Sequence, residues 1–163
     1  MMKIGVIADT HDNMPMIAKA IDVFNSEGCR FVIHAGDYCA PFSLNSFSKL
    51  KCKWIGVFGN NDGEKKGLAM KSNGLIVDHP YRYDLSDKKV LITHEIEDIE
   101  DLKVKIDRGE YSIIICAHTH KVDIKKEKNT LIVNPGECSG WLYGKSTVAI
   151  IDLEKLEAKE IAL

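Results

Sequence analysis

Polar residues with metal-binding atoms directly follow apolar, strand-like runs at five places in this chain. The run over residues 3–8 precedes Asp9 and His11, and the run over residues 30–35 precedes Asp37. The other members of the set are Asn60, His94, His118 and His120. Mixed carboxylate, amide and imidazole donors suit divalent transition ions better than they suit calcium. The pattern therefore indicates metal chemistry.

Each of these short motifs also has an ordinary structural interpretation. A carboxylate such as Asp9 often caps a following helix, and Gly36-Asp37 and residues 59–63 are compositions typical of turns. The two histidines around Thr119 are harder to explain in this way, because burying two imidazoles without partners is costly. Taken together and in this order, the motifs predict a site for two metal ions.

Apolar periodicity predicts the elements that would position these residues. Residues 3–8, 30–35 and 53–58 are short apolar runs of the kind found in buried strands. Between them, Asn13 is well placed to cap a helix that ends at Gly28, and a short helix is predicted over residues 41–50. Strands joined by helical crossovers form a parallel sheet, whose strand carboxyl ends share one edge. The polar residues that follow these strands should converge there.

The second half of the chain is richer in strands. A helical stretch over residues 64–72 is followed by a predicted hairpin, with strands at 81–85 and 90–93 around the turn 86–89. One more amphipathic helix is predicted from Ile96 to Gly109. Further strands are expected at residues 112–117, 122–126, 131–134, 147–153 and 158–163. This number of strands favours two stacked sheets with helices outside, in an order that the sequence does not specify.

Length and composition are those of an ordinary globular chain. The 163 residues are 45% hydrophobic and 28% charged, which predicts a single domain over residues 1–163. A chain of this length buries about 70% of the surface that its unfolded form exposes, so it needs no structural metal to fold. A bound metal would therefore serve chemistry.

Charge, cysteine spacing and hydropathy exclude several classes of protein. A formal net charge of -2 provides no basic field for long nucleic acid. The five cysteines form no Cys-x-x-Cys motif, so neither a disulfide framework nor a zinc ribbon is indicated. No apolar run approaches the roughly 18 residues that a membrane span needs. We therefore expect a cytoplasmic protein without a membrane segment, and the sequence leaves a homo-oligomer open.

The order Asp-x-His, Gly-Asp, Gly-Asn-x-Asp, His and His-x-His resembles that of the calcineurin-like metallophosphoesterases, in particular the small YfcE-like phosphodiesterases. The resemblance extends to Asn134-Pro135-Gly136 and to the chain length. It implies an α/β fold, a four-layer αββα sandwich of two mixed β-sheets flanked by helices. It also implies two divalent metal ions, with manganese favoured and nickel, iron or zinc as alternatives. One ion would be held by Asp9, His11, Asp37 and His120, and the other by Asp37, Asn60, His94 and His118.

The same resemblance implies the hydrolysis of a small phosphodiester. Two divalent ions against two carboxylate ligands leave a surplus of positive charge that attracts a phosphate oxygen. Metal coordination lowers the pKa of a bound water to about 7, so a hydroxide bridging the two ions would be available as the nucleophile. In this interpretation Asp37 and Asn60 are catalytic, as the bridging ligand and as a group that orients phosphate. Asn60 and Asn61 would bind the substrate.

Departures from the family pattern limit the predicted chemistry. Asn61 stands where many members of the superfamily have a histidine, and an amide cannot act as a general acid. Small or activated diesters are therefore the better candidates. Glu95 and Ile96 likewise replace the Gly and His that commonly follow the fourth-motif histidine. A protein-binding scaffold like the retromer subunit of the same fold tolerates such losses, and a phosphomonoesterase or nuclease would use the same metals.

Overall fold

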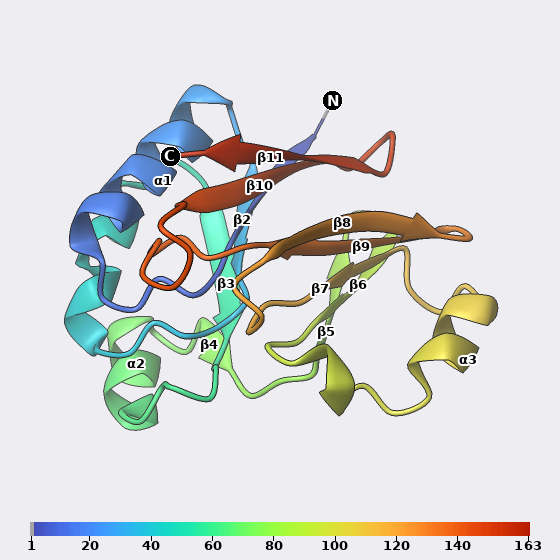
Figure 1. Ribbon diagram of the computed structural model, residues 1–163, viewed down its shortest axis with the longest axis horizontal. Helices are drawn as coiled ribbons and strands as arrows, with labels where there is room; N and C mark the ends of the chain where they lie inside the picture. The colour runs from blue at the N-terminus through green and yellow to red at the C-terminus, as the bar shows by residue number, and fades with distance from the viewer. Residues whose placement is uncertain (1) are drawn as a thin grey trace.

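The computed structural model describes residues 2–163, in which a six-stranded and a five-stranded sheet pack face to face (Figure 1). The first sheet has the order β11-β10-β1-β2-β3-β4. Its strands are β1 (Lys3–Ile7), β2 (Phe31–His34), β3 (Lys53–Val57), β4 (Ile76–Val77), β10 (Thr147–Asp152) and β11 (Glu157–Ala162). Strands β1 to β4 run parallel to one another, whereas β10 and β11 are antiparallel to their neighbours. The predicted parallel pairing of the first three strands is confirmed, within a sheet that is mixed as a whole.

The second sheet has the order β5-β6-β7-β9-β8. Its strands are β5 (Tyr81–Leu85), β6 (Lys88–Ile92), β7 (Ile113–Ile115), β8 (Val122–Glu127) and β9 (Thr130–Pro135). Strands β6, β7 and β9 are parallel, and antiparallel β5 and β8 form the two edges. This sheet is also mixed, so parallel strand ends from both sheets are available to carry site residues.

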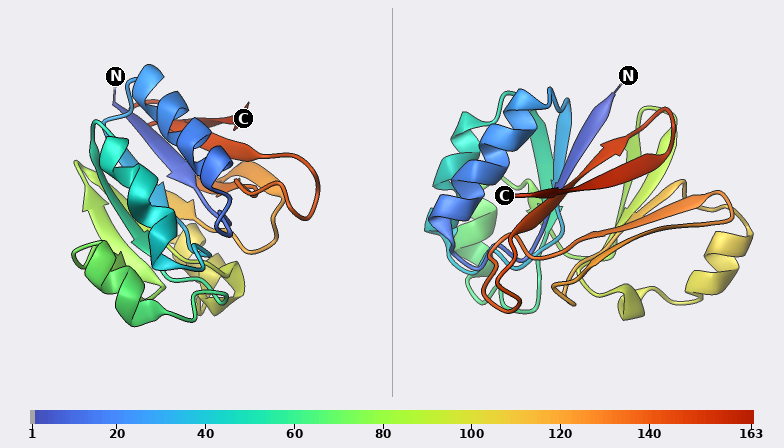
Figure 2. Two further views of the ribbon diagram at one scale, coloured as in Figure 1. Left: turned by 90° about the vertical axis from the view of Figure 1, so that its left-hand side faces the viewer. Right: turned by 45° about the horizontal axis from the view of Figure 1, so that its top comes forward.

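Helices cover the outer face of each sheet (Figure 2). The first sheet carries α1 (Met14–Ser26), the 3₁₀ helix η1 (Pro41–Lys49) and α2 (Lys65–Lys71), and the second carries α3 (Leu102–Asp107). The core between the sheets is built from β-branched residues of both, among them Val6, Ile33, Ile92, Ile115 and Val133. The four-layer αββα sandwich is confirmed. Within residues 2–163, every helix is too short or too polar to cross a bilayer.

One local prediction is wrong, and one short strand was not predicted. The helix expected from Ile96 to Gly109 is divided into the 3₁₀ turn η2 (Ile96–Asp98) and α3. The break lies at Asp101, whose backbone is left-handed with φ 52°. Neighbouring carboxylates in this segment repel one another, and Asp98 lies 3.4 Å from His79. The two-residue strand β4 was not predicted, because so short a run has no detectable period.

Candidate metal centre

The seven residues predicted to bind metal lie in loops at the carboxyl ends of β1, β2, β3, β6 and β7. Backbone hydrogen bonds tie these loops together: the N–H of Asp9 donates to the carbonyl of Gly36 at 3.0 Å, and that of Ala117 to His94 at 2.9 Å. Each sheet thus aligns its own strand ends, and the face-to-face packing of the sheets brings the two sets together. All seven residues gather in two groups that share Asp37.

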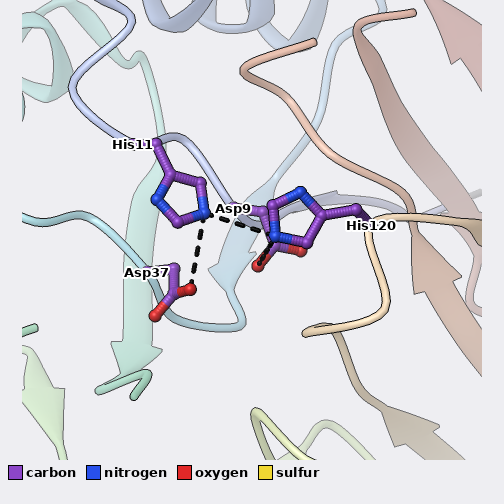
Figure 3. Close-up of side chains that lie close together, drawn as sticks. All are labelled: Asp9, His11, Asp37 and His120. Atoms are coloured by element: carbon purple, nitrogen blue, oxygen red, sulfur yellow. Dashed lines mark hydrogen bonds and ion pairs between the residues drawn. The ribbon is translucent and has the colours of Figure 1, made fainter. Parts of the chain in front are cut away.

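The first group consists of Asp9, His11, Asp37 and His120, with ligand atoms within 4.8 Å of one another (Figure 3). The Nε2 atom of His11 lies 3.4 Å from both Nε2 of His120 and Oδ2 of Asp37. Oδ1 of Asp9 lies 3.7 Å from Nε2 of His120. Two imidazole nitrogens and two carboxylates pointing at a common centre form an arrangement that can hold a divalent cation.

Asp9 provides a direct test of whether a cation fits this group. Its side chain is fully buried, and within residues 2–163 neither carboxylate oxygen has a hydrogen-bond partner. Burial raises the pKa of Asp9 to about 7. A buried carboxylate without donors is costly unless it is paired or coordinates a metal. The residues present therefore fit a bound cation.

The second group is centred on the side-chain carbonyl of Asn60. Its Oδ1 lies 2.9 Å from Nε2 of His94 and 3.0 Å from Nδ1 of His118. Oδ2 of Asp37 lies 3.5 Å from Nε2 of His94. Because the same Asp37 oxygen also faces His11, this one carboxylate lies between the two groups.

Asn61 contacts Asp37 through both its backbone and its side chain. The N–H of Asn61 donates to Oδ1 of Asp37 at 2.9 Å, and its Nδ2 donates to Oδ2 at 2.8 Å. Burial opposes ionisation of Asp37, but His94 and the Asn61 donors outweigh it and hold the pKa of this carboxyl well below its usual range. Asp37 is therefore a carboxylate at neutral pH.

Outer hydrogen bonds orient three of the histidines. Nδ1 of His94 donates to the carbonyl of Ala35 at 2.8 Å, and Nδ1 of His120 lies 3.0 Å from Oε2 of Glu137. Nδ1 of His11 faces Sγ of Cys39 at 3.4 Å. A proton on Nδ1 leaves a lone pair on Nε2, the atom that each of these rings turns toward the site. Burial also lowers the pKa of His11, which favours the neutral ring that can bind a metal.

Glu137 and Asp62, which the sequence pattern did not single out, accept hydrogen bonds that hold the candidate ligands and their loops in place. Buried Glu137 accepts hydrogen bonds from His120 and Ser139 and from the backbone N–H groups of Leu142 and Tyr143. Asp62 accepts backbone N–H groups from the loops after β2 and β3, namely those of Asp37, Tyr38, Cys39 and Gly59. Their positions in the sequence could have indicated these residues, since Glu137 lies two residues after the end of β9 and Asp62 lies within the Gly59 to Gly63 motif.

The backbone is left-handed at five of the seven predicted ligands. Their φ angles are 49° at Asp9, 39° at His11, 62° at Asp37, 68° at His118 and 62° at His120. Non-glycine residues adopt this conformation only at a cost, so the surrounding hydrogen bonds must impose it. Such clustering is typical of sites where side-chain direction serves function rather than stability.

We predict that Gly36→Ala destabilises the protein by about 3 kcal/mol. Gly36 has φ 102°, and a Cβ there would lie 2.7 Å from Nδ1 of His94 and 2.9 Å from the Gly59 backbone. The measurement is urea-induced unfolding. Gly63→Ala is the matched control in the same loop cluster, because a Cβ at Gly63 meets no atom within 4 Å. Equal midpoints for the two variants would contradict the prediction.

Comparison with known proteins agrees with this geometry. Residues 2–156 match the sequence model of the calcineurin-like phosphoesterase superfamily domain. The chain belongs to this superfamily. A phosphodiesterase of Methanocaldococcus jannaschii is 40% identical over 99% of both chains. The resemblance found in the sequence is thereby confirmed, and the protein is a metallophosphoesterase-type hydrolase by family.

Solved structures of this superfamily share the fold. An archaeal phosphodiesterase superposes with a TM-score of 0.91 at 39% identity, covering 99% of this chain and 100% of the other. The E. coli phosphoesterase Yfce superposes with a TM-score of 0.66 at 18% identity, covering 99% of each chain. The first is similar in sequence and structure, whereas the second shows the shared fold alone.

Proposed function

We propose that this chain, as one metallophosphoesterase domain over residues 1–163, hydrolyses small or activated phosphodiesters with two divalent metal ions. The observation that carries the proposal is the placement of Asp37, whose Oδ2 lies 3.4 Å from His11 and 3.5 Å from His94. One carboxylate facing two donor groups suits a pair of cations. The 40% identity to a phosphodiesterase supports the choice of a diester substrate.

In this proposal Asp9, His11, Asp37 and His120 hold one ion, and Asp37, Asn60, His94 and His118 hold the other. Manganese is favoured, and nickel, iron and zinc suit the same donors. When bound, such a pair supplies hydroxide at neutral pH and neutralises charge on the phosphoryl oxygens. The protein needs no serine or cysteine nucleophile.

The chain's own residues would position the substrate around the ions. Asn60 and Asn61 are exposed at the surface of the site, so a phosphodiester can reach both side chains. Oδ1 of Asn60 faces His94 and His118, which leaves its amide N–H groups free to donate to a phosphate oxygen. Asn61 is a donor as well, but it has no titrating proton to give to the leaving oxygen.

The proposal is tested on protein purified without chelator, by elemental analysis and by three assays with Mn²⁺. We expect two ions per chain and faster hydrolysis of bis(p-nitrophenyl) phosphate than of p-nitrophenyl phosphate or an RNA oligonucleotide. Fastest turnover of the monoester or of RNA would indicate a phosphomonoesterase or a nuclease instead. A chain that binds no ion and hydrolyses none of the three would be a scaffold of the same fold.

The asparagine at position 61 predicts a strong dependence on the leaving group. Methyl phenyl phosphate should be hydrolysed far more slowly than methyl p-nitrophenyl phosphate. Asn61→His should reduce the ratio of these two rates by about 100-fold, because an imidazolium can protonate phenoxide as it leaves. Losing the Asn61 contact with Asp37 should slow the hydrolysis of both substrates equally, so this effect cancels in the ratio of the two rates. Asn61→Gln, which adds no acid, should leave the ratio unchanged. A ratio that Asn61→His does not move would rule out this explanation.

A further inference from the structure

The loop between β9 and β10, residues 136–146, can be followed in Figure 1. It exposes three consecutive large apolar side chains and contacts two candidate metal ligands, His11 and His120. Trp141 is 67% exposed, Leu142 62% and Tyr143 52%. Single exposed apolar residues are common, but a contiguous run next to a reactive site marks a binding surface. We call residues 136–146 the rim loop.

The rim loop is fastened to the candidate metal ligands at two points. Glu137, which contacts Nδ1 of His120, accepts the backbone N–H groups of Leu142 at 3.0 Å and Tyr143 at 2.6 Å. On the other side, Nε1 of Trp141 donates to the backbone carbonyl of His11 at 3.2 Å. Hydrogen bonds to a buried carboxylate are strong, so the backbone of the rim loop is held at Leu142 and Tyr143, and the Trp141 side chain is held against His11.

A cavity lies where the rim loop meets His120. Its volume is about 190 Å³, and it is lined by His120, Lys121, Val122, Tyr143, Lys145, Thr147 and Glu160. The Lys121 ammonium lies 5.3 Å from the centre of the Tyr143 ring, and Lys145 pairs with Glu160. An apolar cavity of about 150 Å³ is known to accept benzene, so a single ring fits a space of this size.

We infer that this cavity binds a planar ring carried by one ester group of the substrate, an aryl or nucleoside group, which packs on Tyr143. The inference rests on the proposed function, since His120 places the cavity next to the phosphate site. Stacking on a tyrosine accepts many kinds of planar ring, because every aromatic ring or base has a π face. Lys121, which lines the same cavity, lies over one face of the Tyr143 ring, so the substrate ring would pack on the other face and this lysine would add a cation that attracts the anionic phosphoryl group. The preferred substrates are therefore ring-bearing diesters rather than dialkyl diesters.

The test measures the binding of two non-hydrolysable probes, phenylphosphonate and methylphosphonate, to the Mn²⁺-loaded protein by calorimetry. The wild type should bind phenylphosphonate about tenfold more tightly than methylphosphonate, as expected for one stacked ring. Tyr143→Ala should bring the ratio of the two Kd values close to one, and Tyr143→Phe should preserve it. Val104→Ala, which shortens an exposed apolar side chain of α3, is the control that should keep the wild-type ratio.

The outcomes separate this inference from the proposed function. Equal Kd values in the wild type, or a ratio that Tyr143→Ala leaves unchanged, would overturn the ring site even if diesters are hydrolysed. An absence of diester hydrolysis would count against the proposed function, whereas the binding ratio would still decide whether the cavity takes a ring. A wild-type dimer that Tyr143→Ala converts to a monomer, with an unchanged Kd ratio, would show that a second copy covers the rim loop instead.

Discussion

Asp37→Asn should reduce the bound metal from two ions to at most one and lower diester turnover by about a thousandfold, which corresponds to ~4 kcal/mol of lost transition-state stabilisation. The change keeps the size of the side chain and removes its charge. Asparagine also tolerates the left-handed backbone at this position, where φ is 62°, so the loop should keep its conformation. Elemental analysis of protein purified without chelator gives the first quantity, and hydrolysis of bis(p-nitrophenyl) phosphate gives the second.

The matched control for this experiment is Asp78→Asn. Asp78 is an exposed carboxylate paired with Lys65, so its neutralisation should leave both ions and the turnover at wild-type values. The bridging assignment of Asp37 would be refuted if the Asp37→Asn protein still carried two ions. It would also be weakened if one ion were lost without any change in turnover.

Glu137→Gln should weaken the binding of the first metal ion by about 10-fold to 100-fold, the usual cost of removing a carboxylate behind a metal-binding histidine. A glutamine oxygen at the position of Oε1 can accept from the Leu142 and Tyr143 N–H groups, but the amide nitrogen then takes the place of Oε2 and faces another donor at Nδ1 of His120. The imidazole loses the hydrogen bond that selects its tautomer. Calorimetric titration with Mn²⁺ measures the affinity.

The same variant should lose about 2 kcal/mol of stability in the presence of chelator, because a buried donor is left without a charged acceptor. Urea-induced unfolding measures this loss. Glu157→Gln, at an exposed position of β11, is the control and should change neither quantity. Wild-type metal affinity in the Glu137→Gln protein would show that His120 does not depend on this carboxylate for its orientation.

Most of the strands and helices followed from local pattern. The runs that became β1, β2 and β3 are mostly apolar, as is typical of buried parallel strands, and Asn13 caps α1 as its position suggested. Local pattern failed between Ile96 and Gly109, where the apolar spacing of a helix competes with contacts made elsewhere. Asp98 of this segment lies near His79, and Glu95, the residue before the segment, lies 4.0 Å from His118. A short window of sequence does not reveal such contacts, because their partners lie in other parts of the chain.

For the candidate site as well, the sequence indicated the donor residues, whereas only the tertiary structure showed the groups that orient them. The donor residues were visible in the sequence because each follows an apolar run, and parallel strands deliver their carboxyl ends to one edge. The support of those donors was not visible, since it depends on neighbours from distant segments. His11 and His120 face each other across 109 positions, and Glu137 selects a nitrogen of His120 through a single hydrogen bond. Residue type and order therefore indicate which atoms could bind metal. The packing of the two sheets determines how those atoms are oriented, because orientation depends on contacts that form only when the chain has folded.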